Sequence, residues 1–186
     1  MMGFALLPLM IFARPIEMEP KWLFELLEIV GVFSVIGAVL GRFWSILYIG
    51  GHKNSQVIDA GPYSICRHPL YLFSTLGVIG LGLMLGSLLL AGLFGGLTFL
   101  ALSMTAAREE AFLRAEFGRD YDAYARRVPR ILPRLEGFTT DAEIIVSVRQ
   151  LKTNFFDALV FLSFIPLAEI LEGLKMAGYI PTFPVF

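Results

Sequence analysis

One apolar stretch constrains the fold of this chain more than any other feature. Residues 70–107 contain no Asp, Glu, Lys or Arg. A membrane-spanning helix needs about 20 consecutive apolar residues, so this stretch is long enough for two helices. No polar loop divides it, and the Gly86-Ser87 pair is typical of a tight turn. We therefore predict a hairpin of two membrane helices.

Glycines recur along this hairpin, and we predict that they serve helix packing. Small residues let membrane helices approach one another closely, which favours packing over a phosphate-binding loop. The glycines are Gly77, Gly80, Gly82, Gly86, Gly92, Gly95 and Gly96.

Further apolar stretches cover residues 1–13, 22–49 and 154–179. The chain is 56% hydrophobic and 17% charged, which is more apolar and less charged than a typical soluble domain. Together these features predict an all-α fold, a polytopic membrane helical bundle with about four or five transmembrane helices. Residues 1–13 are predicted to form a short membrane helix, with a signal-like apolar segment as the alternative. Residues 154–179 are predicted to form a span, with a position in the membrane interface as the alternative.

Charged residues inside or beside these stretches have two possible roles. Arg42, with Trp44 and Tyr48, is interpreted as an interfacial anchor in preference to a buried functional charge. Glu169 and Glu172 are three residues apart and therefore share one helix face. These two side chains would either touch the substrate or lie at an interface with another subunit. The sequence does not predict the oligomeric state.

Composition also argues against several classes of function. A net charge of −1 gives no reason to expect a nucleic-acid partner. The single cysteine, Cys66, precludes an intramolecular disulfide and a multi-cysteine metal site. His52 and His68 are far apart in sequence, so no metal site is predicted.

Basic residues indicate the orientation of the helices. Loops rich in Lys and Arg stay on the cytoplasmic side, so the segment 108–152 and, through the hairpin, the loop 50–69 should both face the cytoplasm. The basic residues of this segment are Arg108, Arg114, Arg119, Arg126, Arg127, Arg130, Arg134, Arg149 and Lys152.

The first polar cluster lies where the hairpin begins. His68 precedes a proline and should be extended, while Pro69 suits the first position of a helix. Arg67 and His68 would then lie at the positive end of that helix. The other interpretation is that Arg67 and His68 anchor the hairpin at the membrane interface, with His68 merely hydrogen-bonded. Cys66 is predicted to be a small apolar filler, because no neighbouring group would activate its thiol.

The second polar cluster lies where the hairpin ends. Residues 108–117 are predicted to continue the preceding helix, Gly118 to end it, and 120–127 to form a short helix. Of the adjacent carboxylates Glu109 and Glu110, one would face solvent and the other a pocket. The other interpretation is a pair of amphipathic helices lying on the membrane.

With both clusters in place, the chain resembles the superfamily of isoprenylcysteine carboxyl methyltransferases and phospholipid methyltransferases. The resemblance covers about residues 44–134 and leaves 1–20 and 140–186 without a usable motif. Its residues are Gly61-Pro62-Tyr63, Arg67-His68-Pro69-Leu70-Tyr71, Glu109-Glu110, Leu113, Phe117-Gly118, Tyr121, Tyr124, Val128-Pro129 and Ile131-Leu132-Pro133.

The resemblance implies an integral membrane methyltransferase that uses S-adenosyl-L-methionine. It implies a cytosolic cofactor pocket formed by helix ends and C-terminal amphipathic helices. Glu110 and Arg127 are the catalytic candidates, Glu110 as proton acceptor if the methyl acceptor is an amine. Tyr121, Tyr124 and Arg127 would close the pocket and help to seat the acceptor. The implied cofactor-binding residues are Tyr63, Arg67, His68, Pro69, Tyr71, Glu109, Glu110, Tyr121 and Tyr124.

The resemblance also sets the expected organisation and partners. One membrane domain, 1–186, would contain a methyltransferase core, 44–134, and a C-terminal extension, 135–186. The acceptor would be lipophilic and enter from the bilayer, as an isoprenylcysteine-like carboxylate or a lipid amine, in the cell membrane of a prokaryote. Two alternatives stay open: an NADPH-dependent sterol-type membrane reductase, which has a similar Arg-His-Pro stretch, and a non-enzymatic membrane scaffold or lipid-binding protein.

Overall fold

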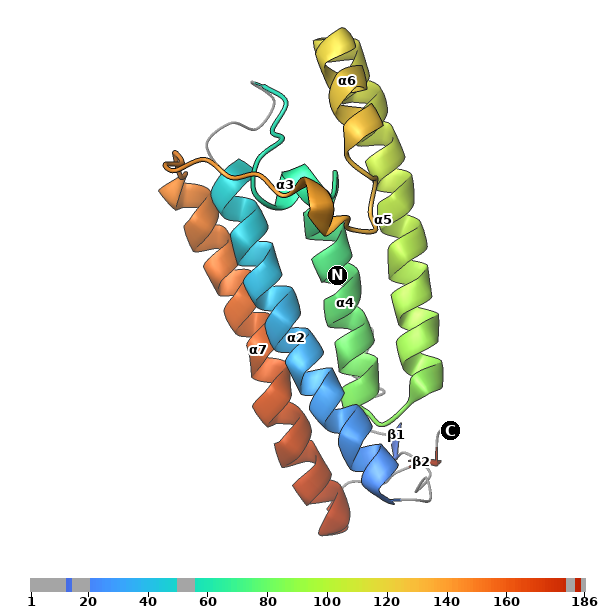
Figure 1. Ribbon diagram of the computed structural model, residues 1–186. Coiled ribbons are helices and arrows are strands. Elements are labelled where there is room, and N and C mark those ends of the chain that lie inside the picture. Colours follow the sequence, from blue (N-terminus) through green and yellow to red (C-terminus); the bar gives the residue numbers. More distant parts are fainter. Residues whose placement is uncertain (1–12, 15–20, 50–55, 180–182, 185–186) are drawn as a thin grey trace. The chain divides into compact units, whose positions relative to one another are not determined.

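The computed structural model describes residues 13–14, 21–49, 56–179 and 183–184. Its main elements are helices (Figure 1), which confirms the predicted all-α class. Outside the helices, Ala13–Arg14 (β1) pairs in parallel with Phe183–Pro184 (β2). The predicted short helix over 1–13 lies outside the described residues except for Ala13, which belongs to β1. The His52 loop also lies outside them.

The long helices follow the apolar stretches. They are α2 (Lys21–Ile49), α4 (Pro69–Met84), α5 (Leu88–Phe117) and α7 (Val148–Met176). Among the described residues, three helices are long and apolar enough to cross a membrane, namely α2, α5 and residues Val148–Lys175 of α7. Helix α4 is a shorter apolar helix of 16 residues, or about 24 Å.

The predicted hairpin is confirmed, with its turn between α4 and α5 (Figure 1). Gly86 has a φ of 65° there, a conformation that glycine adopts without steric cost. The Ser87 hydroxyl accepts a hydrogen bond from the Leu90 N–H at 3.2 Å, which caps the start of α5. The continuation of α5 to Phe117 and the following short helix, α6 (Arg119–Arg127), are also as predicted.

Helix α7 differs from its predicted range. It begins at Val148 and ends at Met176, whereas hydropathy placed it at 154–179. Its first turns contain Arg149 and Lys152, which are exposed, so a helix of mixed polarity precedes the apolar part. Hydropathy registers where a helix becomes apolar, and it misses a polar extension of the same helix.

Contacts between residues divide the chain into two compact units. Each of the helices α2, α4, α5 and α7 contributes residues to both units. The first comprises 1–38, 75–98 and 159–186, and the second comprises 39–74 and 99–158. The predicted division at residue 134 is not tested by this grouping and stays a prediction.

Close packing of α2 against α4 organises the first unit. A Cβ added at Gly80 would lie 2.9 Å from the Gly31 carbonyl oxygen, so only glycines permit this approach of two backbones. Val35, Leu81, Met84 and Phe164 form the buried core beside it. The packing role predicted for the glycines therefore holds at Gly80. In contrast, a Cβ at Gly92 or Gly96 would meet no described atom within 4 Å.

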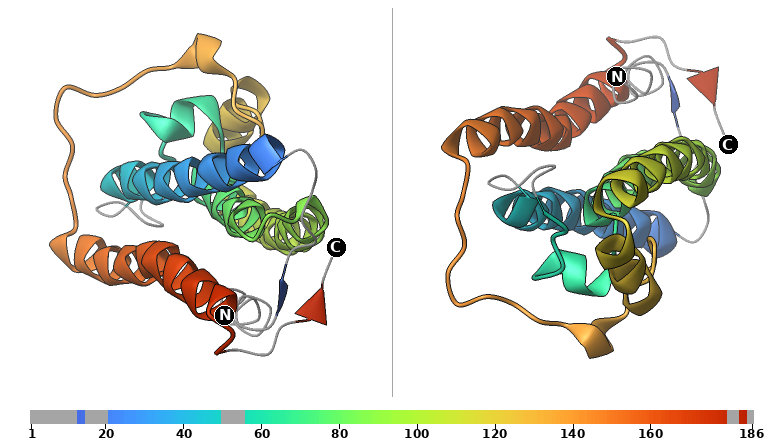
Figure 2. Two further views of the ribbon diagram at one scale, coloured as in Figure 1. Left: turned by 90° about the horizontal axis from the view of Figure 1, so that it is seen from below. Right: turned by 90° about the horizontal axis from the view of Figure 1, so that it is seen from above.

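The second unit contains two short elements that the sequence did not predict. Helix α3 (Pro62–Ile65) follows Gly61, which has a positive φ of 59°, a backbone conformation that glycine adopts without steric cost. The 3-10 helix η1 (Leu135–Gly137) follows α6. The chain then runs to α7 without further helix (Figure 2).

Candidate active site

Backbone pairing holds the Arg67-His68 turn in place within the second unit. The Arg67 N–H donates to the Pro129 carbonyl at 2.9 Å, and the His68 N–H donates to the Arg130 carbonyl at 3.1 Å. The Arg134 N–H donates to the Ile65 carbonyl at 3.0 Å. Helix α4 begins at Pro69, as predicted, so the His68 side chain is fixed between a paired strand-like segment and a helix start.

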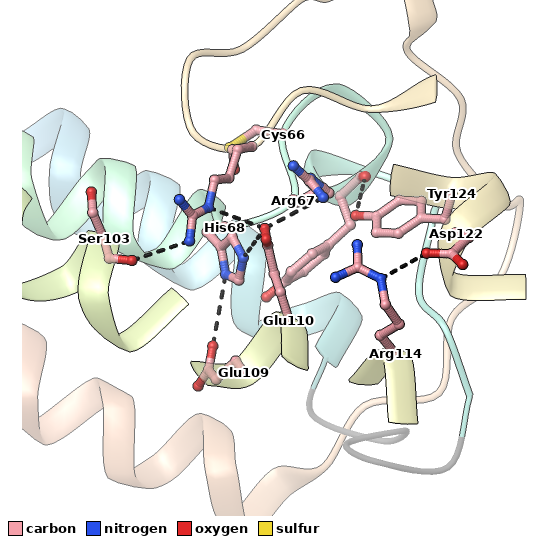
Figure 3. A network of polar contacts seen from close by, with 11 residues as sticks. Cys66, Arg67, His68, Ser103, Glu109, Glu110, Arg114, Asp122 and Tyr124 are labelled. Carbon is pink, nitrogen blue, oxygen red and sulfur yellow. Dashed lines mark hydrogen bonds and ion pairs between the residues drawn. The ribbon is translucent and has the colours of Figure 1, made fainter. Parts of the chain in front are cut away.

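Glu110 is the centre of the site (Figure 3). Its Oε1 atom lies 3.1 Å from His68 Nε2, 3.2 Å from Arg130 Nε and 3.4 Å from Arg67 Nη1. The Glu110 side chain is only 12% exposed, and a buried carboxylate is stable where charged donors surround it. The structure thus brings the two polar clusters of the sequence to one point.

Glu109 lies beside this centre and remains accessible. Its side chain is 49% exposed, and its Oε2 atom lies 3.7 Å from His68 Nδ1. The predicted exposure of one of the two carboxylates is confirmed at Glu109, and the pocket expected at the other stays a prediction. Tyr71 also interacts with Glu109, and its ring stacks on the His68 ring at a centroid distance of 5.3 Å.

Burial lowers the pKa of His68, although the hydrogen bond to Glu110 opposes the shift. The imidazole is therefore neutral near pH 7. Because Glu110 is a carboxylate, the contact assigns the ring proton to Nε2, which donates to Glu110 Oε1. The lone pair of Nδ1 is then available to accept a proton.

Cys66 behaves as the predicted filler. Its thiol is buried and donates to the Ile131 carbonyl at 2.9 Å. Burial raises the pKa of this thiol to about 11, so the nucleophilic thiolate is scarce at neutral pH.

Three tyrosines are buried on the short helices of this unit, namely Tyr63 on α3 and Tyr121 and Tyr124 on α6. The Tyr124 hydroxyl donates to the Tyr63 carbonyl at 2.8 Å, and Tyr121, Tyr124 and Val128 form a buried cluster. Within the described part of the chain, three buried polar atoms make no hydrogen bond of normal geometry: Tyr63 Oη, Arg67 Nε and Tyr121 Oη. Buried polar groups are seldom left unpaired, so these atoms are available to a bound molecule or to water.

Arg127 is not among the residues that contact Glu110. It forms an ion pair with Asp59, and its side chain is 63% exposed. Both residues line a cavity of about 560 Å³, and Tyr124 also lines it. The catalytic role of Arg127 and its role in seating the acceptor both stay predictions.

Arg130 is the residue that sequence reasoning missed. Its Nε atom contacts Glu110, and its Nη2 donates to the Ser103 carbonyl at 3.2 Å. From sequence, Arg130 was recognisable only as one of the basic residues that indicate orientation. The available signal was its position between Pro129 and Pro133, where two prolines restrict the backbone.

A sequence profile described as "Phospholipid methyltransferase" matches residues 23–120. The chain belongs to this phospholipid methyltransferase family. The matched range includes both members of the Arg67-His68 pair and both carboxylates of the Glu109-Glu110 pair. The superfamily named from the sequence is thereby confirmed.

Several curated proteins resemble this family member. A nickel-cobalt-cadmium resistance protein of Alcaligenes xylosoxydans xylosoxydans is 35% identical over 90% of this chain and 78% of its own length. A cobalt-zinc-cadmium resistance protein of Cupriavidus metallidurans is 35% identical over 86% and 74%. A probable protein-S-isoprenylcysteine O-methyltransferase of Oryza sativa is 32% identical over 59% and 56%. No solved structure matches significantly.

Proposed function

We propose that this chain transfers a methyl group from S-adenosyl-L-methionine to a lipophilic acceptor at the membrane. The observation that carries the proposal is the convergence of Arg67, His68 and Arg130 on Glu110, beside buried polar atoms that lack partners. Membership of the phospholipid methyltransferase family and similarity to isoprenylcysteine O-methyltransferases support it.

The side chains present fit the groups of this cofactor. The accessible Glu109 carboxylate suits an ammonium or hydroxyl group, and Arg67, with its free Nε–H, suits a carboxylate. The Tyr71 face suits a sulfonium through cation–π attraction, and the unpaired hydroxyls of Tyr63 and Tyr121 suit further polar atoms. When bound, the cofactor supplies an electrophilic methyl group on sulfur.

Glu110 and His68 have different roles in this proposal: Glu110 positions neighbouring side chains, and His68 accepts a proton where the acceptor is an amine. Contacts of Glu110 Oε1 with His68, Arg130 and Arg67 fix the orientation of these side chains. Positioning of reactants contributes about 7–11 kcal/mol in favourable cases. A carboxylate acceptor is already nucleophilic at neutral pH. An amine acceptor must lose a proton, which the neutral His68 can accept at Nδ1 and share with the nearby Glu109. Glu110, the proton acceptor expected from sequence, then acts through His68.

The metal-resistance names of two relatives suggest a physiological setting. Among the described residues, no group of three or more His, Cys, Asp or Glu side chains is arranged to hold a metal ion. We therefore propose that any part this protein plays in resistance acts through a methylated membrane component.

A labelling experiment tests the proposed activity. Membranes containing the protein are incubated with methyl-labelled S-adenosylmethionine, and label is measured in the extracted lipid fraction, with Glu110→Gln as the inactive control. Titration calorimetry with S-adenosylhomocysteine tests cofactor binding separately. Absence of both label and binding would reject the proposal and favour a scaffold, whereas thermal stabilisation by NADPH alone would favour a reductase.

We also propose that the site faces the cytoplasm, because the segment 108–152, which contributes Glu110 and Arg130 to it, is rich in Lys and Arg. A Glu143→Cys variant tests this, since residue 143 is exposed and Cys66 is buried. A membrane-impermeant thiol reagent should label it only in inverted vesicles. Labelling in intact cells would reverse the assignment.

A further inference from the structure

Arg42 has an unusual position in the second unit. It lies in the apolar helix α2, yet its guanidinium contacts two other helices: Nη1 donates to Ser74 Oγ on α4, and Nη2 lies 3.5 Å from Asn154 Oδ1 on α7. The side chain is partly buried. These contacts direct the guanidinium toward neighbouring helices, and the interfacial anchor expected from sequence stays a prediction.

The charge of Arg42 is not neutralised by an ion pair among the described residues. Its two side-chain partners, Ser74 and Asn154, are both neutral. Asp157 attracts it electrostatically but forms no ion pair with it, and the Asp157 side chain is exposed. A cation whose hydrogen-bond partners are neutral is costly in an apolar environment, and an anionic ligand would offset more of that cost than the exposed Asp157 does.

The depth of Arg42 along its helix indicates which kind of anion can reach it. Arg42 precedes the end of α2 at Ile49 by about 10 Å, and Asn154 follows the start of α7 at Val148 by about 9 Å. Helix α2 is about 43 Å long, whereas the hydrocarbon layer is about 30 Å thick. Arg42 therefore lies near the boundary between hydrocarbon and headgroups, where amphiphiles carry their charge.

Ser74 relates this position to the candidate active site. It lies on α4 about 8 Å from Pro69, the residue that follows His68. An amphiphile with its anionic group at Arg42 would therefore lie within about two helical turns of the Glu110 cluster.

We propose that Arg42, with Ser74 and Asn154, binds the anionic group of an amphiphile, a carboxylate or a phosphate carried on an apolar chain. Identification of this amphiphile as the methyl acceptor rests on the proposed function, but the binding does not.

Thermal unfolding of the full chain in a neutral detergent tests the site. The probes are dodecyl phosphate, dodecanoate, dodecanol and inorganic phosphate. A ligand that binds the folded state raises the unfolding temperature, and at one ligand concentration the rise grows with the logarithm of its affinity. We expect dodecyl phosphate and dodecanoate to bind at least about tenfold more tightly than dodecanol, and inorganic phosphate to give no shift.

Three variants locate the effect. Arg42→Gln removes the charge, and Asn154→Asp keeps Arg42 but supplies an internal carboxylate; each should abolish the preference for the anionic probes. Asn154→Asp also serves if Arg42→Gln fails to fold. Arg149→Gln, which removes an exposed arginine on α7, is the matched control and should keep the preference within about twofold.

Each contrary outcome overturns the inference. An unchanged preference in Arg42→Gln or Asn154→Asp excludes the site, and equal loss in Arg149→Gln indicates a general surface charge. An equal shift from inorganic phosphate indicates a site for free anions. The proposed function is tested apart from this. Anion binding that depends on Arg42, without methyl transfer, would reject only the proposed activity. Methyl transfer with Arg42-independent binding would reject only the inferred site.

Discussion

His68 Nε2 lies 3.1 Å from Glu110 Oε1, although 42 positions separate the two residues in the chain. The intervening sequence is almost entirely the apolar hairpin. One residue precedes its first helix and the other lies near the end of its second. The hairpin therefore has a role beyond anchoring, because it delivers the two halves of a polar site to the same place.

Glu110→Gln tests the centre of the site. Loss of the negative charge leaves Arg67 and Arg130 without their shared carboxylate. We expect methyl transfer to fall by about 10²-fold or more, and binding of S-adenosylhomocysteine to weaken. Activity is measured with labelled cofactor in membranes, and binding by calorimetry.

Glu116→Gln is the control for this variant. It removes an exposed carboxylate from the same helix and should retain full activity. Wild-type turnover in Glu110→Gln would show that the Glu110 charge has no part in the reaction.

Arg130 provides a second test, because it connects Glu110 to the Ser103 carbonyl through two different nitrogens. A hydrogen bond to a charged group contributes about 1.5–3 kcal/mol, so Arg130→Gln should lower activity by about 10- to 150-fold. Arg130→Lys should be intermediate, since an ammonium cannot reproduce the planar guanidinium fork.

Arg126→Gln, an exposed arginine on α6, is the matched control for Arg130. Equal effects of the two substitutions on kcat/KM would indicate that only the overall positive charge of this segment matters.

Tyr124 and Tyr121 should respond differently to removal of a hydroxyl. Tyr124→Phe deletes a buried hydrogen bond to the Tyr63 carbonyl and should destabilise the protein by about 0.5–1.5 kcal/mol. Tyr121→Phe deletes a hydroxyl that interacts with Arg67 without a hydrogen bond of normal geometry, so it should lower the unfolding temperature less than Tyr124→Phe does.

Tyr121→Phe should nevertheless weaken the binding of S-adenosylhomocysteine if the hydroxyl meets the cofactor. Unfolding temperatures are compared with and without this ligand. A fall of the unfolding temperature in ligand-free Tyr121→Phe as large as that in Tyr124→Phe would show that this hydroxyl already makes a full structural hydrogen bond.

His68 predicts a dependence of stability on pH. Burial lowers its pKa from 6.5 in the folded protein, so the unfolded chain binds the proton more readily. The stability contributed by the neutral ring is therefore complete above about pH 6.5 and declines as the pH falls below that value. The unfolding temperature should fall between about pH 6.5 and 5, and His68→Gln should flatten this decline. An identical slope in wild type and variant would contradict the assignment.

The parts of the fold that depend on local sequence were predictable. Apolar length located α2, α4 and α5, and the Gly86-Ser87 pair located the turn. The helix start at Pro69 and the helix end at Gly118 followed from backbone chemistry. At the site, the different exposures of Glu109 and Glu110 followed from their adjacent positions on a helix.

The parts that depend on long-range pairing were not predictable from one sequence. Arg130 reaches Glu110 because residues 129–134 pair with 65–68 through backbone hydrogen bonds, and no local pattern encodes that register. The contacts of Arg42 with Ser74 and Asn154 likewise depend on how three helices meet. The sequence alone could identify Arg42 only as a charge near a helix end.

The pairing of residues 65–68 with 129–134 has a consequence for biosynthesis. A ribosome completes the hairpin and both glutamates well before it reaches Arg130 and Arg134. Until then the turn that carries His68 lacks its backbone partners, and Glu110 lacks one of its cations. The polar cluster around Glu110 therefore assembles only after residues 129–134 have been made, and a chain released before them would contain the hairpin without these contacts.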